Sequence, residues 1–236
     1  MPLTTGNLLL DALSPPLQAE ILSLGRTIDL PSRTMLREQN EKSAYAYFLL
    51  NGVASQVITM VEGSTAEVGL TGHEGIVGAM QLLGPTPTPS QSSMLLPGSA
   101  LRVRCEDLCP LFLTNAELRS RILEFLQQQS ITLEQTSACN RLHLAEPRLI
   151  RWLLMCYDRS HQDTMSLTQE FMANMLGTRR TTVTLLAGSL QKRGLISYRR
   201  GKVTLLAHQE LERAACHCYQ ICRRALHNLY QTSLQP

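Results

Sequence analysis

The chain has 236 residues, of which 44% are hydrophobic, and this length allows two modest hydrophobic cores. No apolar run is long enough for a membrane-spanning helix, and the N-terminus lacks the charged start and long apolar core of a signal peptide. Seven cysteines, an odd number scattered along the chain, favour reduced thiols and a cytoplasmic protein.

The net charge is only +3, but it is divided unevenly along the chain. From Pro147 onward there are 13 basic and 5 acidic residues, a net charge of +8, whereas residues 1–146 carry −5. A basic terminal domain on an acidic body indicates a nucleic-acid partner. An acidic membrane is the alternative, but no amphipathic helix of the lipid-binding kind is present, so no membrane partner is expected.

The N-terminal part predicts a short helical region followed by many short strands. The helical region spans residues 7–24 and is broken by Pro15-Pro16. Asn51-Gly52 and Glu62-Gly63 are predicted turns. Short strands at such regular intervals favour a small jelly-roll or barrel. The predicted strands are 27–30, 34–37, 45–50, 53–61, 66–70, 94–96 and 100–104.

Residues 106–141 predict a helical segment with a long stripe at spacings of three and four. A long helix between two domains often packs against its symmetry mate, which predicts a homodimer. The alternative is that the stripe packs against the chain's own barrel. The residues expected at the dimer contact are Leu118, Ile122, Phe125, Gln129 and Leu133.

Residues 167–205 predict two short helices, a tight turn and a basic hairpin. Thr168 caps the first helix and Gly177 ends it, since glycine adopts a positive φ easily. Thr178 caps the second helix, which runs to about Arg193. Residues 195–198 and 203–206 then form a hairpin whose turn is Arg199-Arg200-Gly201-Lys202.

This arrangement is that of a winged helix-turn-helix, which presents one helix to the major groove of DNA. Arg180 lies in the first turn of the second helix, and arginine contacts guanine O6 and N7 bidentately. The alternative is a helical hairpin with a solvated basic face. The residues expected to contact double-stranded DNA are Thr168, Gln169, Thr178, Arg179, Arg180, Thr181, Thr182, Thr184, Leu185, Ser189, Arg199, Arg200 and Lys202.

The order barrel, long helix, winged helix-turn-helix resembles the bacterial cyclic-AMP-receptor/FNR (Crp/Fnr) superfamily of transcription regulators. The resemblance covers nearly the whole chain and is most specific in the runs at residues 45–84 and 167–196. It implies a homodimer that binds pseudo-palindromic promoter sites and contacts RNA polymerase. Arg180 matches the arginine at the helix start that reads guanine in this family.

Two positions depart from the family's best-known members. Those members carry Glu after the arginine and a second Arg four residues further on, whereas this chain has Thr181 and Leu185. Glu accepts a hydrogen bond from cytosine, but Thr and Leu offer a contact to the thymine methyl group. We therefore expect a different half-site.

The effector site also departs from the family pattern. The loop that resembles the cyclic-nucleotide site contains His73, Glu74 and Gly75, followed by Ser92 and Ser93, and no Arg or Lys lies between Lys42 and Arg102. A buried phosphate without a cation is poorly compensated, so weak or no cyclic AMP binding is expected. Glu74 is either a ribose contact or a solvated turn residue, and any effector is unidentified.

The cysteines raise the question of a metal or redox sensor. No cysteine precedes Cys105, which excludes the N-terminal iron–sulfur ligands of FNR-type proteins. Three cysteines lie close together near the end of the chain, at Cys216, Cys218 and Cys222. The last two share a helix face, but the spacing of the three matches no common zinc motif. We therefore expect no cofactor and no metal, although a redox- or metal-responsive role for these cysteines is left open.

Other classes of protein fit the sequence less well. The motifs of P-loop, serine-hydrolase, zinc-protease and dinucleotide-binding enzymes are absent, so no enzymatic activity is expected. A scaffold would not explain a capped helix with basic residues and a basic wing. The prediction is an α+β protein with a β-barrel at 1–110, a dimerisation helix and hinge at 111–145, and a winged helix-turn-helix at 146–236. Its function is that of a DNA-binding regulator, the alternative being gating by a cyclic nucleotide or another small ligand.

Overall fold

The computed structural model describes residues 4–231 and has the predicted α+β architecture. Two short helices, α1 (Leu8–Asp11) and α2 (Pro15–Leu24), precede the sheet, and Pro15 and Pro16 begin α2 instead of interrupting a helix. A six-stranded antiparallel sheet follows, with the order β1-β6-β3-β4; β2 pairs with β6 and β5 pairs with β3. The strands are β1 (Gly25–Leu30), β2 (Met35–Arg37), β3 (Tyr45–Thr59), β4 (Thr65–Thr71), β5 (Ile76–Val77) and β6 (Gln91–Arg104).

The two long strands, β3 and β6, run through positions that the sequence predicted as breaks. Asn51-Gly52 is not a turn, because β3 continues through it and its register against β6 shifts between Leu49 and Ala54. Gly52 has φ +80°, so the bulge uses the conformational freedom that also makes Asn-Gly common in turns. The Glu62-Gly63 turn is confirmed between β3 and β4, where Gly63 has φ +86°.

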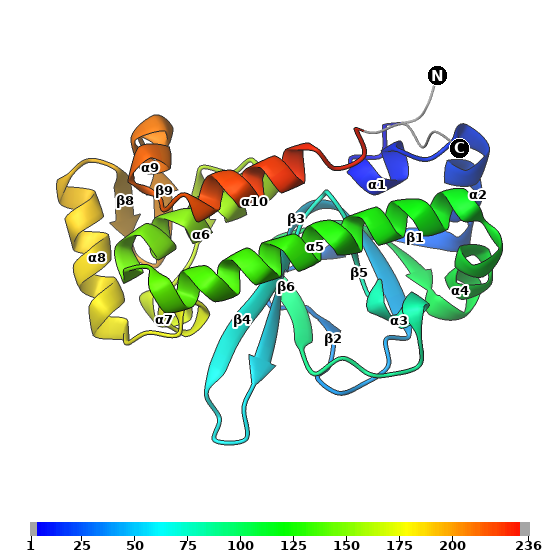
Figure 1. Ribbon diagram of the computed structural model, residues 1–236, viewed down its shortest axis with the longest axis horizontal. Helices are drawn as coiled ribbons and strands as arrows, with labels where there is room; N and C mark the ends of the chain where they lie inside the picture. Colours follow the sequence, from blue (N-terminus) through cyan, green and yellow to red (C-terminus); the bar gives the residue numbers. More distant parts are fainter. Residues whose placement is uncertain (1–3, 232–236) are drawn as a thin grey trace.

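The predicted helical segment is divided into α4 (Cys105–Thr114) and the 27-residue α5 (Ala116–Leu142). Asn115 separates them, and its side chain caps α5 by accepting a hydrogen bond from the Leu118 amide at 3.0 Å. A short helix, α3 (Met80–Leu83), lies between β5 and β6. Figure 1 shows α5 extending along the length of the molecule beside the sheet.

The apolar stripe of α5 faces the sheet of the same chain. Leu118, Ile122 and Phe125 are at most 2% exposed, in a core formed with α1, α2, α4 and the sheet. These three residues therefore pack on their own β-domain, which is the alternative that the sequence left open, and they are not available to a second helix. Leu133 is 46% exposed, and Gln129 donates to the Leu70 carbonyl at 3.0 Å.

Up to residue 231, the C-terminal half contains the three helices and three strands of the helix-turn-helix unit, followed by two further helices. They are α6 (Ala145–Ser160), β7 (Thr164–Ser166), α7 (Gln169–Leu176), α8 (Arg180–Lys192), β8 (Ile196–Arg199), β9 (Lys202–Leu205), α9 (His208–Ala214) and α10 (Cys218–His227). The strands form a second sheet with the order β7-β9-β8. The last helix, α10, lies along α5, so the end of the chain returns to the long helix (Figure 1).

The two halves of the chain share a hydrophobic core. Val57 and Leu70 of the sheet belong to the same buried cluster as Trp152 of α6 and Met175 of α7. Trp152 Nε1 also donates to Glu67 of β4 at 2.6 Å. The β-domain and the helix-turn-helix unit are therefore in direct contact, and the predicted boundaries at 110/111 and 145/146 stay predictions.

Over residues 4–231, no helix has the length and apolarity needed to cross a membrane.

Candidate nucleic-acid interface

The helix-turn-helix geometry follows from three local features. The Thr168 side chain accepts a hydrogen bond from the Phe171 amide at 3.1 Å and so caps α7 as predicted. Gly177 ends α7 in the left-handed conformation, with φ +58°. The cap of α8 differs from the prediction, because Arg179 and not Thr178 occupies the N-cap position and makes no side-chain cap. Arg180 is consequently the first residue of α8.

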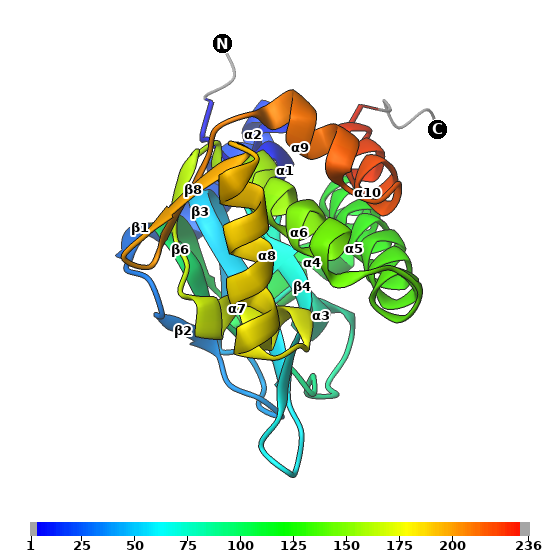
Figure 2. The ribbon, with the colours of Figure 1, turned by 90° about the vertical axis from the view of Figure 1, so that its left-hand side faces the viewer.

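One face of α8 packs inward and the opposite face is exposed. Val183, Ala187 and Leu190 are buried in the shared core. The predicted base-reading residues Arg180, Thr181, Thr184 and Leu185 are exposed, and Figure 2 shows α8 in front of the molecule with the β8–β9 hairpin beside it. This exposed face has the length and the free side chains needed to enter a major groove.

Arg180 extends into solvent from the exposed face of α8. Its side chain is 67% exposed, and its nearest carboxylate is that of Glu170, with 3.9 Å between Nε and Oε2. Leu185 is 75% exposed, which is unusual for a leucine and places an apolar group on the outer face of α8. The Thr184 hydroxyl already has a partner within the helix-turn-helix unit, because it donates a hydrogen bond to Gln169 at 2.7 Å.

The wing is a tight hairpin of β8 and β9, shifted by one residue from the predicted strands. Arg200 and Gly201 form its turn with φ +50° and +76°, two successive positive values that match the twist of a two-residue hairpin. Arg199, Arg200 and Lys202 are exposed, so the turn places three cations at one end of the unit. Such cations suit phosphate oxygens.

Three of the predicted DNA contacts have other surroundings. Thr178 and Thr182 are half-buried at the turn and the start of α8. Ser189 is half-buried and donates to Glu146 of α6 at 3.4 Å, on the side of α8 that faces its own chain. Arg193, which the sequence analysis did not single out, pairs with the same Glu146 at 2.6 Å and joins the end of α8 to the start of α6.

The loop predicted as an effector site is instead a contact between the two halves. Glu74 is fully buried and pairs with Arg159 of α6 at 2.8 Å, while the Gly72 amide donates to its other oxygen at 2.9 Å. Burial alone lowers the pKa of Arg159, but the charges of Glu74 and Asp158 outweigh this effect and raise it. His73 also bonds the Arg159 carbonyl at 2.9 Å. Glu74 is thus neither a free ligand contact nor a solvated turn residue.

A cavity of 510 Å³ lies between the sheet and α5. Ser92 lines it, whereas His73, Glu74, Gly75 and Ser93 do not. Arg37 of β2 also lines it, donates to Ser90 at 2.8 Å and has no partner for its Nε among the described residues. Burial lowers the pKa of Arg37. This cation lies outside the range between Lys42 and Arg102, in which the sequence has no Arg or Lys, and it reaches the cavity because β2 pairs with β6.

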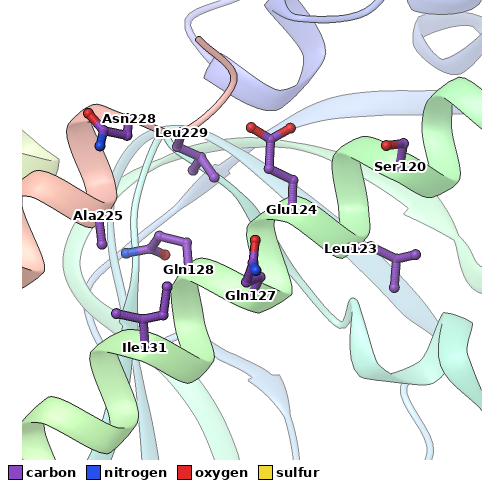
Figure 3. A pocket seen from close by; sticks show the side chains of 9 residues that line it. All are labelled: Ser120, Leu123, Glu124, Gln127, Gln128, Ile131, Ala225, Asn228 and Leu229. Carbon is purple, nitrogen blue, oxygen red and sulfur yellow. The ribbon is translucent and has the colours of Figure 1, made fainter. Parts of the chain in front are cut away.

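A second hollow follows the seam between α5 and α10, with a volume of 680 Å³ (Figure 3). Its α5 side carries Leu123, Glu124 and Gln127, and its α10 side carries Ala225 and Asn228. Leu123 is 47% exposed and Gln127 is also exposed, so the free side of α5 is mixed in polarity. This side of α5 remains accessible once the apolar stripe of the helix is buried.

Known proteins resemble this geometry. Residues 147–214 match the model of the Crp-like helix-turn-helix domain. A transcriptional regulator of the Crp/Fnr family from Eubacterium rectale has a TM-score of 0.67 at 16% identity, covering 87% of this chain and 96% of its own. FixK2 from Bradyrhizobium japonicum has a TM-score of 0.68 at 14% identity, with 81% and 98% covered. A comparison with curated protein sequences finds no match.

A third similar structure is the c-di-GMP-responsive global regulator CLP from Xanthomonas campestris, with a TM-score of 0.63, 18% identity, and 82% and 99% of the two chains covered. These three solved structures share the order of sheet, long helix and terminal helix-turn-helix with this chain. This chain carries a Crp-like helix-turn-helix domain on a body with the Crp/Fnr fold, as its sequence predicted.

Proposed function

We propose that this protein is a Crp/Fnr-type transcription regulator that binds pseudo-palindromic DNA as a homodimer in the cytoplasm. The observation that carries the proposal is the free outer face of α8, on which Arg180, Thr181 and Leu185 project without partners in the protein core, next to three cations of the wing. Arg180 reads a guanine and the wing cations contact phosphates. RNA polymerase is the expected protein partner, and no enzymatic step is involved.

The half-site should differ from that of the best-known family members. Thr181 and the exposed Leu185 offer methyl groups where those members offer charged groups, and a thymine methyl is their natural contact in the major groove. We expect a half-site that keeps one guanine under Arg180 and has thymines nearby.

The second copy is proposed to contact the free side of α5. Leu123 and Leu133 are exposed there, at 47% and 46%, and a two-fold axis along this helix would place two recognition helices on one face of DNA. Half-sites one helical turn apart, roughly 34 Å, would then be read together. Light scattering of the purified protein tests the dimer, and Leu123→Glu should shift it toward the monomer.

Selection of bound fragments from randomised DNA tests the proposed function. We expect an enriched two-fold motif. Arg180→Ala should weaken binding by about 1–3 kcal/mol and relax specificity at one base pair. Arg26→Ala removes the same charge from an exposed position of β1 and serves as the control. A motif unchanged by Arg180→Ala would remove this residue from base reading, and the absence of any DNA binding would refute the proposed function.

A second candidate function is gating by a small anionic ligand, and the buried Arg37 in the cavity favours it. A guanidinium beside Ser90 and Ser92, with one N–H unpaired, is a ready partner for a carboxylate or phosphate. Cyclic AMP remains a poor fit, since Glu74, the expected ribose contact, is committed to Arg159.

Calorimetry with cyclic AMP, cyclic di-GMP, phosphate and simple carboxylates, repeated on Arg37→Gln, tests the gating. Binding that is lost in the variant supports a ligand in this cavity. Micromolar binding of cyclic AMP would contradict the expectation drawn from Glu74.

A further inference from the structure

Three cysteines and one histidine from distant parts of the chain meet where α5 ends and α10 begins. Cys139 lies in the last turn of α5, and His143 follows the helix as its C-cap. Cys218 begins α10, and Cys216 lies two residues before it and 77 residues after Cys139. The three sulfur atoms and one imidazole nitrogen all lie within 4.8 Å of one another.

The separations suit one tetrahedral ion. Zinc–sulfur and zinc–nitrogen bonds of about 2.3 and 2.0 Å place tetrahedral ligands about 3.8 Å apart for two sulfurs and about 3.5 Å apart for sulfur and nitrogen. Here Cys139 Sγ and Cys216 Sγ are 3.4 Å apart. His143 Nδ1 is 3.5 Å from Cys139 Sγ and 3.4 Å from Cys218 Sγ. These three separations are within about 0.4 Å of the tetrahedral values, and the other separations within the cluster are at most 4.8 Å.

A buried cation lies beside the cluster. Arg151 of α6 is 2% exposed and forms no ion pair among the described residues; its Nη1 donates to Thr136 at 3.1 Å, and its Nε has no partner. Three thiolates and an imidazole on a dication carry a net charge of −1, which a buried guanidinium would offset. Gln135 donates to Cys218 Sγ at 3.0 Å, as outer residues of metal sites do.

Without a metal, the side chains of the cluster stabilise one another only weakly. Three neutral thiols are weak hydrogen-bonding groups, and they themselves offer no negative charge to Arg151. A dication resolves both problems by displacing the thiol protons to solvent.

We propose that Cys139, His143, Cys216 and Cys218 bind one Zn²⁺ ion, which clamps the start of α10 to the end of α5. Cys₃His is a ligand set of closed structural zinc sites. The ion would lie beside the α5–α6 junction, because α6 begins at Ala145. It would thereby fix the junction that positions the helix-turn-helix unit relative to the long helix.

The test is the zinc content of untagged protein, purified with reductant and without chelator. We expect one equivalent of zinc per chain, and tetrahedral cobalt bands with thiolate charge-transfer absorption when Co²⁺ replaces it. His143→Gln and Cys216→Ser should each lower affinity by more than the roughly 10- to 100-fold cost of losing an outer-shell partner. His143 is exposed and Cys216 half-buried, so both variants should fold.

Cys109→Ser is the matched control, because Cys109 is a half-buried thiol of α4 outside the cluster, and it should keep full zinc content. Chelation should increase amide exchange in residues 218–227 of the wild type, and it should do so to the same extent in the Cys109→Ser protein. The proposal would be overturned if the zinc-free protein took up no added zinc, or if both ligand variants bound zinc as tightly as the wild type. A Cys139–Cys216 disulfide in place of the site, or iron with an iron–sulfur spectrum, would overturn it as well. DNA binding is a separate readout, so a failed zinc site leaves the proposed function standing.

Discussion

The buried pair of Glu74 and Arg159 gives the sharpest test of how the two halves are joined. Glu74→Gln keeps the size of the side chain but removes its charge, leaving the Arg159 guanidinium, 2% exposed, with an amide as partner. Removing one member of such a pair costs about 3–5 kcal/mol, since the remaining charge is buried without its direct ion-pair partner. This is a large part of the 5–15 kcal/mol that stabilises a typical domain. Denaturant unfolding of both proteins measures the difference.

Two further variants make the result specific to the buried pair. Glu74→Gln combined with Arg159→Met removes both charges, and we expect it to recover most of the lost stability. Glu146→Gln breaks the Arg193–Glu146 pair, whose side chains are 45% and 29% exposed, and it should cost no more than about 1 kcal/mol. If Glu74→Gln costs as little as Glu146→Gln, water reaches Arg159 in solution, and the closed contact between the β-domain and α6 is refuted.

Three other changes test the remaining features. Desolvation raises the pKa of Glu67 from 4.5 to about 7, so the unfolded chain loses this proton before the folded one. Stability should therefore fall by about 3 kcal/mol as the pH rises from 4.5 to 7, and Glu67→Gln should remove this slope from pH-dependent unfolding curves. Gly188→Ala should stabilise α8 by up to about 1 kcal/mol, because a Cβ at Gly188 meets nothing within 4 Å, yet it should weaken DNA binding measured by fluorescence anisotropy if the helix approaches the DNA closely there. Lys202→Ala should weaken binding to all sequences alike and lower the salt slope by about 1; a sequence-dependent loss would move Lys202 from phosphate contact to base contact.

Local signals in the sequence predicted most of the fold. The caps and turns of the helix-turn-helix unit depend on near neighbours, as the bond from the Phe171 amide to Thr168 and the left-handed Gly177 show. The prediction of a turn at Asn51-Gly52 was wrong, because a bulge in a long strand requires the same positive φ as a hairpin turn. The stripe of α5 was recognised, but a periodic pattern does not tell which apolar surface covers it.

The sites that the sequence could not predict all depend on distant residues. Glu74 looks like a loop residue, and only the packing of α6 against its loop supplies Arg159. Arg37 reaches the cavity through strand pairing, outside the window in which a cation was sought. Cys139 and Cys216 are 77 positions apart, so no spacing rule connects them, although the i, i+4 pair of Cys139 and His143 was a visible partial signal.

The hydrophobic core shared by Leu70, Trp152 and Met175 has a consequence for how this protein can be engineered. A cut at the α5–α6 junction would expose apolar faces on both products, so neither half is expected to behave as an independent module. Transplanting this helix-turn-helix unit onto another regulator would require transplanting the matching strand surface of β3 and β4 with it. Any change in DNA specificity is therefore better sought by substitutions on the outer face of α8 than by exchange of whole domains.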